Sequence, residues 1–203
     1  MLRRLLLTVT ILISTIFASN IVEAPDNFKL KTIDGSTIEA TGKKSGLDIP
    51  EAKGQIVLIE FWGTHCPPCL FSIPHYIDLT KEYKGKVKMY AIEVQGTPKE
   101  SLKKFVKAKG INYSIFTQSE NRDFVNYLAY RSGWRGAIPF LMIFDKDGNF
   151  ITRKRGMVSE EYIKQIINYL LNPPKKTLNK SSEQNRTKEQ NITKKDANSS
   201  SSK

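Results

Sequence analysis

Two kinds of segment alternate along the chain. Short apolar runs bounded by turn residues predict buried strands, and longer segments whose apolar positions recur every three or four residues predict amphipathic helices. The expected strands are rich in branched and aromatic residues, and they are 56–62, 86–94, 112–116, 138–144 and 150–153. The expected helices carry charged residues between their apolar positions, and they are 67–83, 98–109, 122–131 and 160–171. Alternation of this kind predicts an α/β domain.

The N-terminal segment differs from this pattern. Residues 1–24 begin with two arginines and continue with an apolar stretch from Leu5 to Ala18, which is typical of a secretion signal. The stretch is shorter than the roughly 20 residues that a membrane-spanning helix needs. Because neither Ala18 nor Ala24 offers a good cleavage site, an uncleaved membrane anchor is the alternative. We therefore expect a periplasmic protein, either soluble or held at the inner membrane by this segment.

The C-terminal segment also differs from the middle of the chain. Residues 25–172 are numerous enough to form one domain with its own core. Residues 173–203 contain no aromatic side chain and many Lys, Ser, Asn and Thr, so we expect a disordered, basic and polar tail. The tail supplies +5 and the two leading arginines +2 of the net charge of +12. Since much of the basic charge lies outside the domain, nucleic acid is not an expected partner.

Three units in this tail share the order acid-x-Asn-x-Ser/Thr. Their asparagines are Asn185, Asn191 and Asn198. The pattern resembles the extended N-glycosylation acceptor of some bacteria, and a disordered exported tail would be accessible to that modification. Chance in a segment rich in Asn, Ser and Thr is the alternative interpretation.

The two cysteines of the chain lie together as Cys66-Pro67-Pro68-Cys69, shortly after the apolar run 56–62. Three positions apart on a helix, they lie about one turn from each other and can form a disulfide. Cys66 would stand at the helix N-terminus, where unpaired N–H groups and the helix dipole favour a thiolate. Pro67 suits the first helical position. We interpret the pair as a redox site in which Cys66 attacks a disulfide and Cys69 resolves the mixed disulfide.

Other interpretations of this pair are a structural bridge and a metal site. A bridge across so short a loop removes little chain entropy. A metal site usually needs four ligands, and beyond the cysteines the chain has only two histidines, His65 and His75. We therefore expect no bound metal and no cofactor, and a copper-carrying protein that uses Cys66 and Cys69 is the alternative of a different class.

Several segments together resemble the thioredoxin superfamily, in particular its TlpA/ResA-type exported members. One segment is the active-site order Glu60-Phe61-Trp62-Gly63-Thr64-His65-Cys66-Pro67-Pro68-Cys69, and Pro74 follows it where thioredoxins carry a helix proline. The apolar run from Pro139 resembles the strand that begins with the family's cis-proline, and the segment 25–36 resembles its N-terminal hairpin. The resemblance covers about residues 25–171.

This resemblance implies a thioredoxin fold: a central mixed β-sheet flanked by helices, with an N-terminal β-hairpin and an inserted strand and helix at 112–131. It implies an exported thiol–disulfide oxidoreductase that reduces protein disulfides, with apocytochrome c maturation as the leading specific role. The implied partners are exported proteins that carry disulfides or thiols, and a membrane thiol–disulfide electron donor. A disulfide-forming oxidant is an alternative, because the same site can run in reverse. A thiol peroxidase is a further alternative, although peroxidatic sites usually read Thr-x-x-Cys without a resolving cysteine three residues on.

A charged residue, Glu60, interrupts the apolar run 56–62. A charge in a buried strand is costly unless it is partnered or neutral. Burial raises the pKa of a carboxyl group, and a carboxyl with a raised pKa can move a proton near neutral pH. We expect Glu60 to accept and donate the proton of Cys69, and the alternative is a glutamate at a sheet edge that faces solvent.

The remaining candidates are substrate-binding residues. By the resemblance, Ile138 and Pro139 belong to a loop that faces the cysteines and offers backbone hydrogen bonds to a substrate chain. Trp62 is expected beside the active site, with packing in the core as the alternative. His65, where the family often carries Trp, can raise the positive potential near Cys66 when it is protonated.

Overall fold

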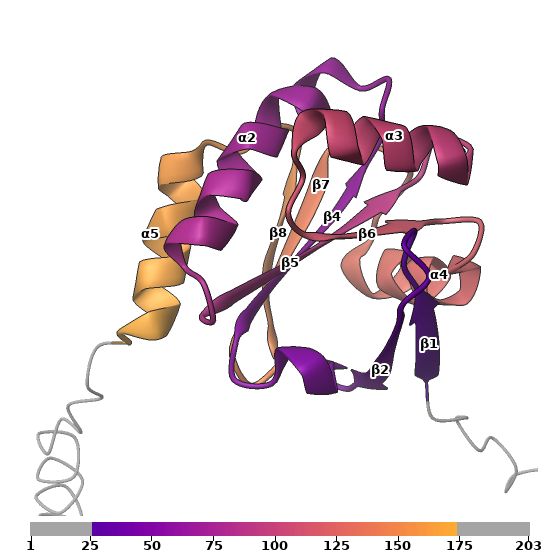
Figure 1. Cartoon of the computed structure of the whole chain (residues 1–203). Coiled ribbons are helices and arrows are strands. Elements are labelled where there is room, and N and C mark those ends of the chain that lie inside the picture. Colours follow the sequence, from indigo (N-terminus) through magenta and orange to yellow (C-terminus); the bar gives the residue numbers. More distant parts are fainter. Residues whose placement is uncertain (1–25, 174–203) are drawn as a thin grey trace, which may run out of the picture. The chain divides into compact units, whose positions relative to one another are not determined.

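The computed structural model describes residues 26–173. Contacts divide the chain into two units, Met1–Leu170 and Leu171–Lys203, and the fold below is that of the first unit (Figure 1). The signal or anchor predicted for residues 1–24 and the asparagines of the three tail units lie outside the described residues. Among the described helices, none has the length and apolar character needed to cross a bilayer.

The described residues form strands and helices in alternation, as the hydrophobic pattern predicts. The strands are β1 (Asn27–Lys31), β2 (Thr37–Lys43), β3 (Gly46–Asp48), β4 (Ile56–Trp62), β5 (Val87–Glu93), β6 (Ser114–Thr117), β7 (Phe140–Phe144) and β8 (Phe150–Arg155). The helices are the short 3₁₀ helix η1 (Pro50–Ala52) and the α-helices α2 (Pro67–Glu82), α3 (Lys99–Lys109), α4 (Arg122–Ser132) and α5 (Glu160–Leu171). The α/β class is therefore confirmed.

The central sheet has five strands in the order β6-β5-β4-β7-β8. Strand β4 pairs in parallel with β5 and antiparallel with β7, so the sheet is mixed. All seven residues of β4 are buried, which is why this strand is apolar at every position except Glu60 and shows no alternation of apolar and polar residues. In both parallel connections, β4-α2-β5 and β5-α3-β6, a helix lies between the two strands, as is usual for parallel neighbours.

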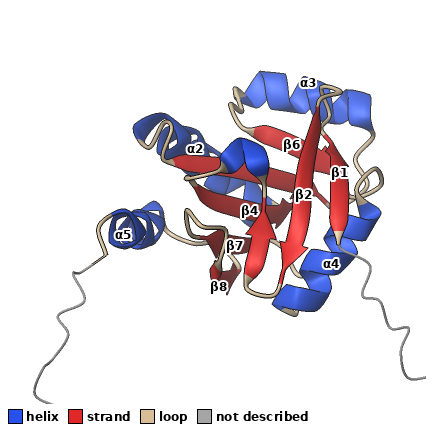
Figure 2. Cartoon of the chain, turned by 90° about the horizontal axis from the view of Figure 1, so that it is seen from below, coloured by secondary structure: helices blue, strands red, loops and turns tan. Residues whose placement is uncertain are grey.

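The two faces of the sheet are covered by different elements (Figure 2). Alternate residues of β4 point to opposite faces. Val57, Ile59 and Phe61 pack into the main apolar core with residues of β1, β2 and α4. On the other face, Glu60 contacts α2 through a hydrogen bond, and Trp62 contacts the ring of Phe105 on α3.

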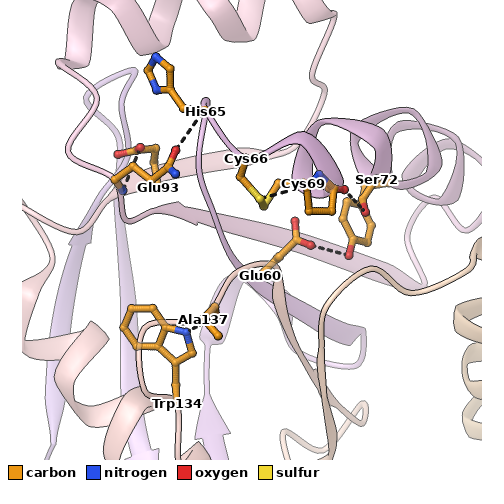
Figure 3. The surroundings of a disulfide bond; sticks show 11 residues. Glu60, His65, Cys66, Cys69, Ser72, Glu93, Trp134 and Ala137 are labelled. Carbon is orange, nitrogen blue, oxygen red and sulfur yellow. Dashed lines mark hydrogen bonds between the residues drawn. A yellow bond between two sulfur atoms is a disulfide. The ribbon is translucent and has the colours of Figure 1, made fainter.

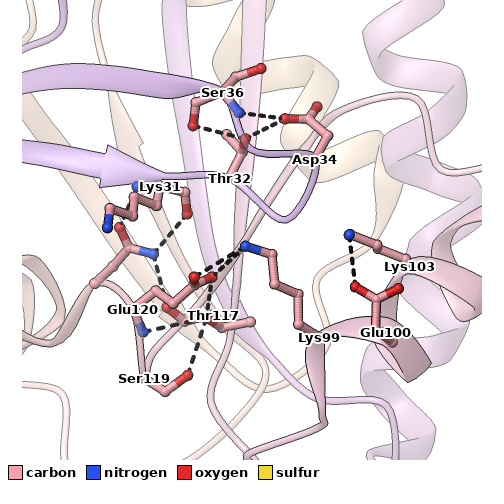
Figure 4. Close-up of polar contacts among 11 residues, drawn as sticks. Lys31, Thr32, Asp34, Ser36, Lys99, Glu100, Lys103, Thr117, Ser119 and Glu120 are labelled. Atoms are coloured by element: carbon pink, nitrogen blue, oxygen red, sulfur yellow. Dashed lines mark hydrogen bonds and ion pairs between the residues drawn. The ribbon is translucent and has the colours of Figure 1, made fainter.

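The N-terminal strands form a second, smaller antiparallel sheet in the order β1-β2-β3. The predicted hairpin is β1-β2, whereas the short strand β3 and the helix η1 were not predicted. Polar contacts attach this sheet to the inserted segment that contains β6 and α4 (Figure 4). The Asn121 side chain accepts a hydrogen bond from Lys31 N at 2.8 Å and donates one to Lys31 O at 3.0 Å. Nearby, Lys99 of α3 forms an ion pair with Glu120 at 3.0 Å.

Strand boundaries near the predicted cis-proline differ from the sequence expectation. β7 begins at Phe140 and not at residue 138, because Pro139 has no N–H for a ladder hydrogen bond. The carbonyl of Pro139 accepts a hydrogen bond from Gly156 N at 2.8 Å, and β8 extends to Arg155. This contact ties the start of β7 to the residue that follows β8.

Candidate active site

Two loops meet at one end of the central sheet because of the strand directions. Phe61 near the C-terminal end of β4 pairs with Phe140 at the start of the antiparallel neighbour β7. The loop that leaves β4 leads to Cys66, and the loop that enters β7 carries Ile138 and Pro139. The cysteine pair and the proline loop, which are about 70 residues apart in sequence, are therefore brought to the same edge, as the resemblance implies.

Cys66 and Cys69 are joined by a disulfide at the N-terminus of α2 (Figure 3). Cys66 is the N-cap residue, and its Sγ accepts a hydrogen bond from the backbone N–H of Cys69 at 3.3 Å. Pro67 and Pro68 occupy the first two helical positions, where a missing N–H costs nothing. Cys66 is 6% exposed and Cys69 is fully buried, so Cys66 is the sulfur that a partner reaches first.

Glu60 lies beneath the disulfide, in the middle of β4. The residue is 3% exposed, and its Oε1 accepts a hydrogen bond from the hydroxyl of Tyr76 at 2.9 Å. Burial raises the pKa of the Glu60 carboxyl to about 8, while the hydrogen bond from Tyr76 opposes part of that rise. The predicted burial of this carboxyl is confirmed, and the solvent-facing alternative is wrong.

Tyr76 is a site residue that was not predicted from the sequence. It is 1% exposed on α2, and burial together with the neighbouring Glu60 raises the pKa of its hydroxyl well above the ordinary value. The ring of Tyr113, just before β6, meets it edge to face at 6.3 Å between centroids. Tyr76 follows Cys69 by two helical turns, so helical spacing alone places both on the same face of α2.

The proline loop has the conformation that the resemblance implies. The Ile138–Pro139 peptide bond is cis. Trp134 supports the loop from below, because its indole Nε1–H donates to the carbonyl of Ala137 at 2.7 Å. The same indole packs on the ring of Phe61 with 4.5 Å between centroids.

The two aromatic candidates for substrate contact occupy different environments. Trp62 is 2% exposed and packs against Phe105, so it is a core residue and not a surface contact, contrary to the substrate-binding prediction. His65 is exposed, as a contact residue must be. Figure 3 shows its ring directed away from the two sulfur atoms, and its Nδ1 lies 3.0 Å from Thr64 Oγ1.

Comparison with known proteins places this arrangement in a family. The family model described as "AhpC/TSA family" matches residues 22–152. The thiol-disulfide oxidoreductase ResA of Bacillus thuringiensis subsp. konkukian is 30% identical over 151 residues, which is 71% of this chain and 76% of the relative. ResA of Bacillus subtilis strain 168 is 25% identical over 149 residues, covering 73% of this chain and 74% of the relative.

Solved structures agree with the sequence relatives. The crystal structure of a thiol:disulfide interchange protein of the thioredoxin family from Chlorobium tepidum TLS matches with a TM-score of 0.58 and 25% identity. The match covers 73% of this chain and 94% of that chain. The predicted thioredoxin fold is thus confirmed. The chain belongs to the AhpC/TSA family of the thioredoxin superfamily, and it is a thiol–disulfide oxidoreductase.

Proposed function

We propose that this oxidoreductase is exported and that it reduces disulfides of other exported proteins through Cys66 and Cys69. One observation carries the proposal. The more exposed sulfur stands at a helix N-terminus, and a buried carboxyl whose pKa is about 8 lies beneath the pair. A nucleophile and a proton carrier are the two groups that disulfide exchange requires.

In the first step, the Cys66 thiolate of the reduced protein attacks one sulfur of a substrate disulfide. A bond forms between Cys66 and that sulfur, the substrate disulfide breaks, and the other substrate sulfur leaves as a thiolate that takes a proton from water. The N-terminal end of α2 favours the attacking thiolate, because the helix dipole and the backbone N–H of Cys69 both point toward Sγ.

In the second step, Cys69 resolves the mixed disulfide. Glu60, as a carboxylate, takes the proton of the Cys69 thiol, and the resulting thiolate attacks the sulfur of Cys66. The disulfide seen in the structure forms, and the substrate is released with both sulfurs reduced. A Glu60 pKa of about 8 fits this cycle, because at neutral pH Glu60 of the oxidised protein keeps the proton that it took from Cys69. Glu60 returns it to Cys69 when an electron donor reduces the pair again.

The substrate chain would lie against the proline loop. The carbonyl of Pro139 is already occupied by Gly156, so the backbone groups offered to a substrate are those of Ile138. His65 immediately precedes Cys66 and is exposed, which suits a second contact. Extended substrate backbone between these two residues would bring its disulfide to Cys66.

The two electrons of each cycle would come from a membrane thiol–disulfide donor, which reduces the Cys66–Cys69 disulfide by the same exchange chemistry. Export is supported by the arginine pair and apolar stretch at the start of the chain. Reduction of apocytochrome c before haem attachment is the specific role we propose, because haem attachment requires free thiols. The proposed location is the periplasm, in solution or at the inner membrane.

The experiment that tests the direction is the reduction potential of the Cys66–Cys69 pair, measured by equilibration of the protein in dithiothreitol or glutathione buffers. A value near or below about −270 mV, the range of thioredoxin, supports a reductant. A value near about −120 mV, the range of a strong oxidant, would instead make the protein a disulfide-forming enzyme.

A further inference from the structure

The turn that follows β5 binds the turn that precedes the reactive cysteine. We name residues 93–97 the β5 turn and residues 63–66 the active-site turn. The two turns leave neighbouring parallel strands, and Trp62 at the end of β4 pairs with Glu93 at the end of β5. Figure 3 shows Glu93 beside the segment that carries His65. Their proximity follows from the strand register, but the contacts between them depend on particular side chains.

The β5 turn is organised by the carboxylate of Glu93, which is 1% exposed. Its oxygens accept hydrogen bonds from the backbone N–H groups of Gln95 at 3.0 Å, Gly96 at 3.1 Å and Thr97 at 3.0 Å. A fourth hydrogen bond comes from Thr97 Oγ1 at 2.8 Å. A buried carboxylate with this many donors is well compensated for its lost hydration. The β5 turn is therefore a rigid support.

Two side chains of the β5 turn reach the active-site turn. Gln95 Oε1 accepts a hydrogen bond from the backbone N–H of His65 at 2.9 Å. Thr97 Oγ1 lies 2.7 Å from Thr64 Oγ1. Thr64 and His65, the two residues before Cys66, are thus both attached to the β5 turn.

The direction of these hydrogen bonds follows from counting protons. A carboxylate only accepts, so the hydroxyl proton of Thr97 is donated to Glu93. Thr97 Oγ1 must then accept from Thr64, whose single hydroxyl proton is used in this contact. Thr64 Oγ1 must in turn accept from Nδ1 of His65, 3.0 Å away. His65 therefore carries a proton on Nδ1, and the chain of hydrogen bonds holds its ring on the side away from the disulfide.

Gly63 is required for this arrangement. A Cβ built on Gly63 would overlap the Cγ, Cδ and Oε1 atoms of Gln95. The Gln95 side chain therefore lies across the bare backbone of Gly63 to reach the N–H of His65. Any larger residue at position 63 would displace Gln95 from its hydrogen bond.

We propose that Gln95 is a positioning residue that sets the reactivity of Cys66, an inference that rests on the proposed role of Cys66 as the attacking thiol. By fixing the His65 peptide, Gln95 holds the Cys66 sulfur at the N-terminus of α2. Without this contact the active-site turn samples other orientations, and the thiolate loses part of its stabilisation. One neutral hydrogen bond is worth about 1 kcal/mol, which corresponds to roughly a fivefold change in rate.

The test compares Gln95→Met with Gln165→Met in the full-length protein. Methionine keeps the size of glutamine but accepts no comparable hydrogen bond, and both positions are exposed, so folding should be preserved. The rate of iodoacetamide alkylation of reduced Cys66 is measured between pH 5 and 9. We expect Gln95→Met to alkylate about fivefold more slowly at pH 6, with its pH profile shifted upward, while Gln165→Met matches the parent protein. An unchanged profile for Gln95→Met would overturn the proposal.

A second comparison tests the coupling between Gly63 and Gln95. Gly63→Ala should slow alkylation by about the same factor as Gln95→Ala, and the double variant should be no slower than either single variant, since the same contact is lost in all three. If the alkylation rate of the double variant fell by the product of the two single-variant factors, the proposal would be contradicted.

A Cys66→Ser variant is assayed for disulfide reduction in parallel. Its full activity would refute the attacking role of Cys66, an outcome distinct from failure of the Gln95 inference.

Discussion

Replacement of Glu60 by glutamine should stabilise the oxidised protein at neutral pH and impair it as a catalyst. In an unfolded chain this carboxyl titrates near 4.5, and in the folded protein burial raises its pKa to about 8. Between these values the folded state keeps a proton that the unfolded state has released. The stability contribution of Glu60 is therefore complete below pH 4.5 and is lost as pH rises to about 8.

The magnitude follows from the size of the shift. Each pH unit inside this window costs about 1.4 kcal/mol, so the loss by pH 7 is about 3 kcal/mol and by pH 8, where the folded carboxyl is half ionised, about 4 kcal/mol. Glutamine does not ionise, and its Oε1 can still accept the hydrogen bond from Tyr76. Its amide group, however, has two buried donors to satisfy, which costs about 1 kcal/mol or more. We expect Glu60→Gln to be slightly destabilising at pH 4 and stabilising by about 2 kcal/mol at pH 7.

The assay is urea unfolding of both oxidised proteins, followed by circular dichroism at pH 4, 5, 6, 7 and 8. Every other titrating group is common to the two proteins, so the difference between their free energies of unfolding isolates Glu60. Glu39→Gln, at an exposed position of β2, is the matched control and should show no pH-dependent difference. A difference for Glu60→Gln that is flat from pH 4 to pH 8 would refute the raised pKa.

The same substitution should separate the two chemical steps. Glutamine cannot take the proton of Cys69, whereas attack by Cys66 does not depend on Glu60. General base catalysis typically contributes at least about 100-fold, so we expect disulfide reduction to slow by about that factor. The mixed disulfide with substrate should accumulate, which non-reducing electrophoresis detects. Slowing of the first step by the same factor would show that Glu60 acts on Cys66 as well.

Tyr76→Phe removes the hydrogen bond that lowers the pKa of Glu60, so the pKa should rise above about 8, and the pH profile of disulfide reduction should move upward; an unchanged profile would remove Tyr76 from the proton-carrying site. Cys69→Ser should trap a stable mixed disulfide between Cys66 and substrate, seen as a band that dithiothreitol removes; steady turnover by this variant would contradict the resolving role. Leu79→Ala, at a fully buried position of α2, should lower the free energy of unfolding measured in urea by about 2–5 kcal/mol. The reduction potential of the cysteine pair should not change. A smaller loss of stability would mean that the core closes around the cavity.

Local patterns were sufficient to predict most elements of the fold. The bounds of β4 and α5 agree with their predicted ranges, because each is a strongly patterned segment with clear turn residues at its ends. Strand β3 was not predicted because its three residues are too few to show a hydrophobic pattern. It is a strand because it pairs with β2, and that pairing is not visible in the local sequence. The redox pair was predicted because its chemistry depends on neighbours in sequence.

The contacts that tune the site could not be predicted in the same way. Gln95 is 30 residues from the backbone group that it binds, and nothing in its own neighbourhood distinguishes it from a solvent-exposed glutamine in a turn. Tyr76 carried a usable signal, since its spacing from Cys69 places it on the active-site face of α2. Its partner Glu60, however, is supplied by a different element, and only the packing of α2 on β4 brings the two together.

The burial of Glu60 and the burial of Trp62 have the same origin in strand β4. Glu60 and Trp62 are two residues apart on β4, so they point to the same face of the sheet. That face is covered by α2 at Glu60 and by α3 at Trp62. The burial that raises the pKa of Glu60 thus also removes the indole from the surface. A buried carboxyl at position 60 is therefore consistent with a core residue at position 62, and the proposed substrate contact would have to come from other residues, such as the exposed His65.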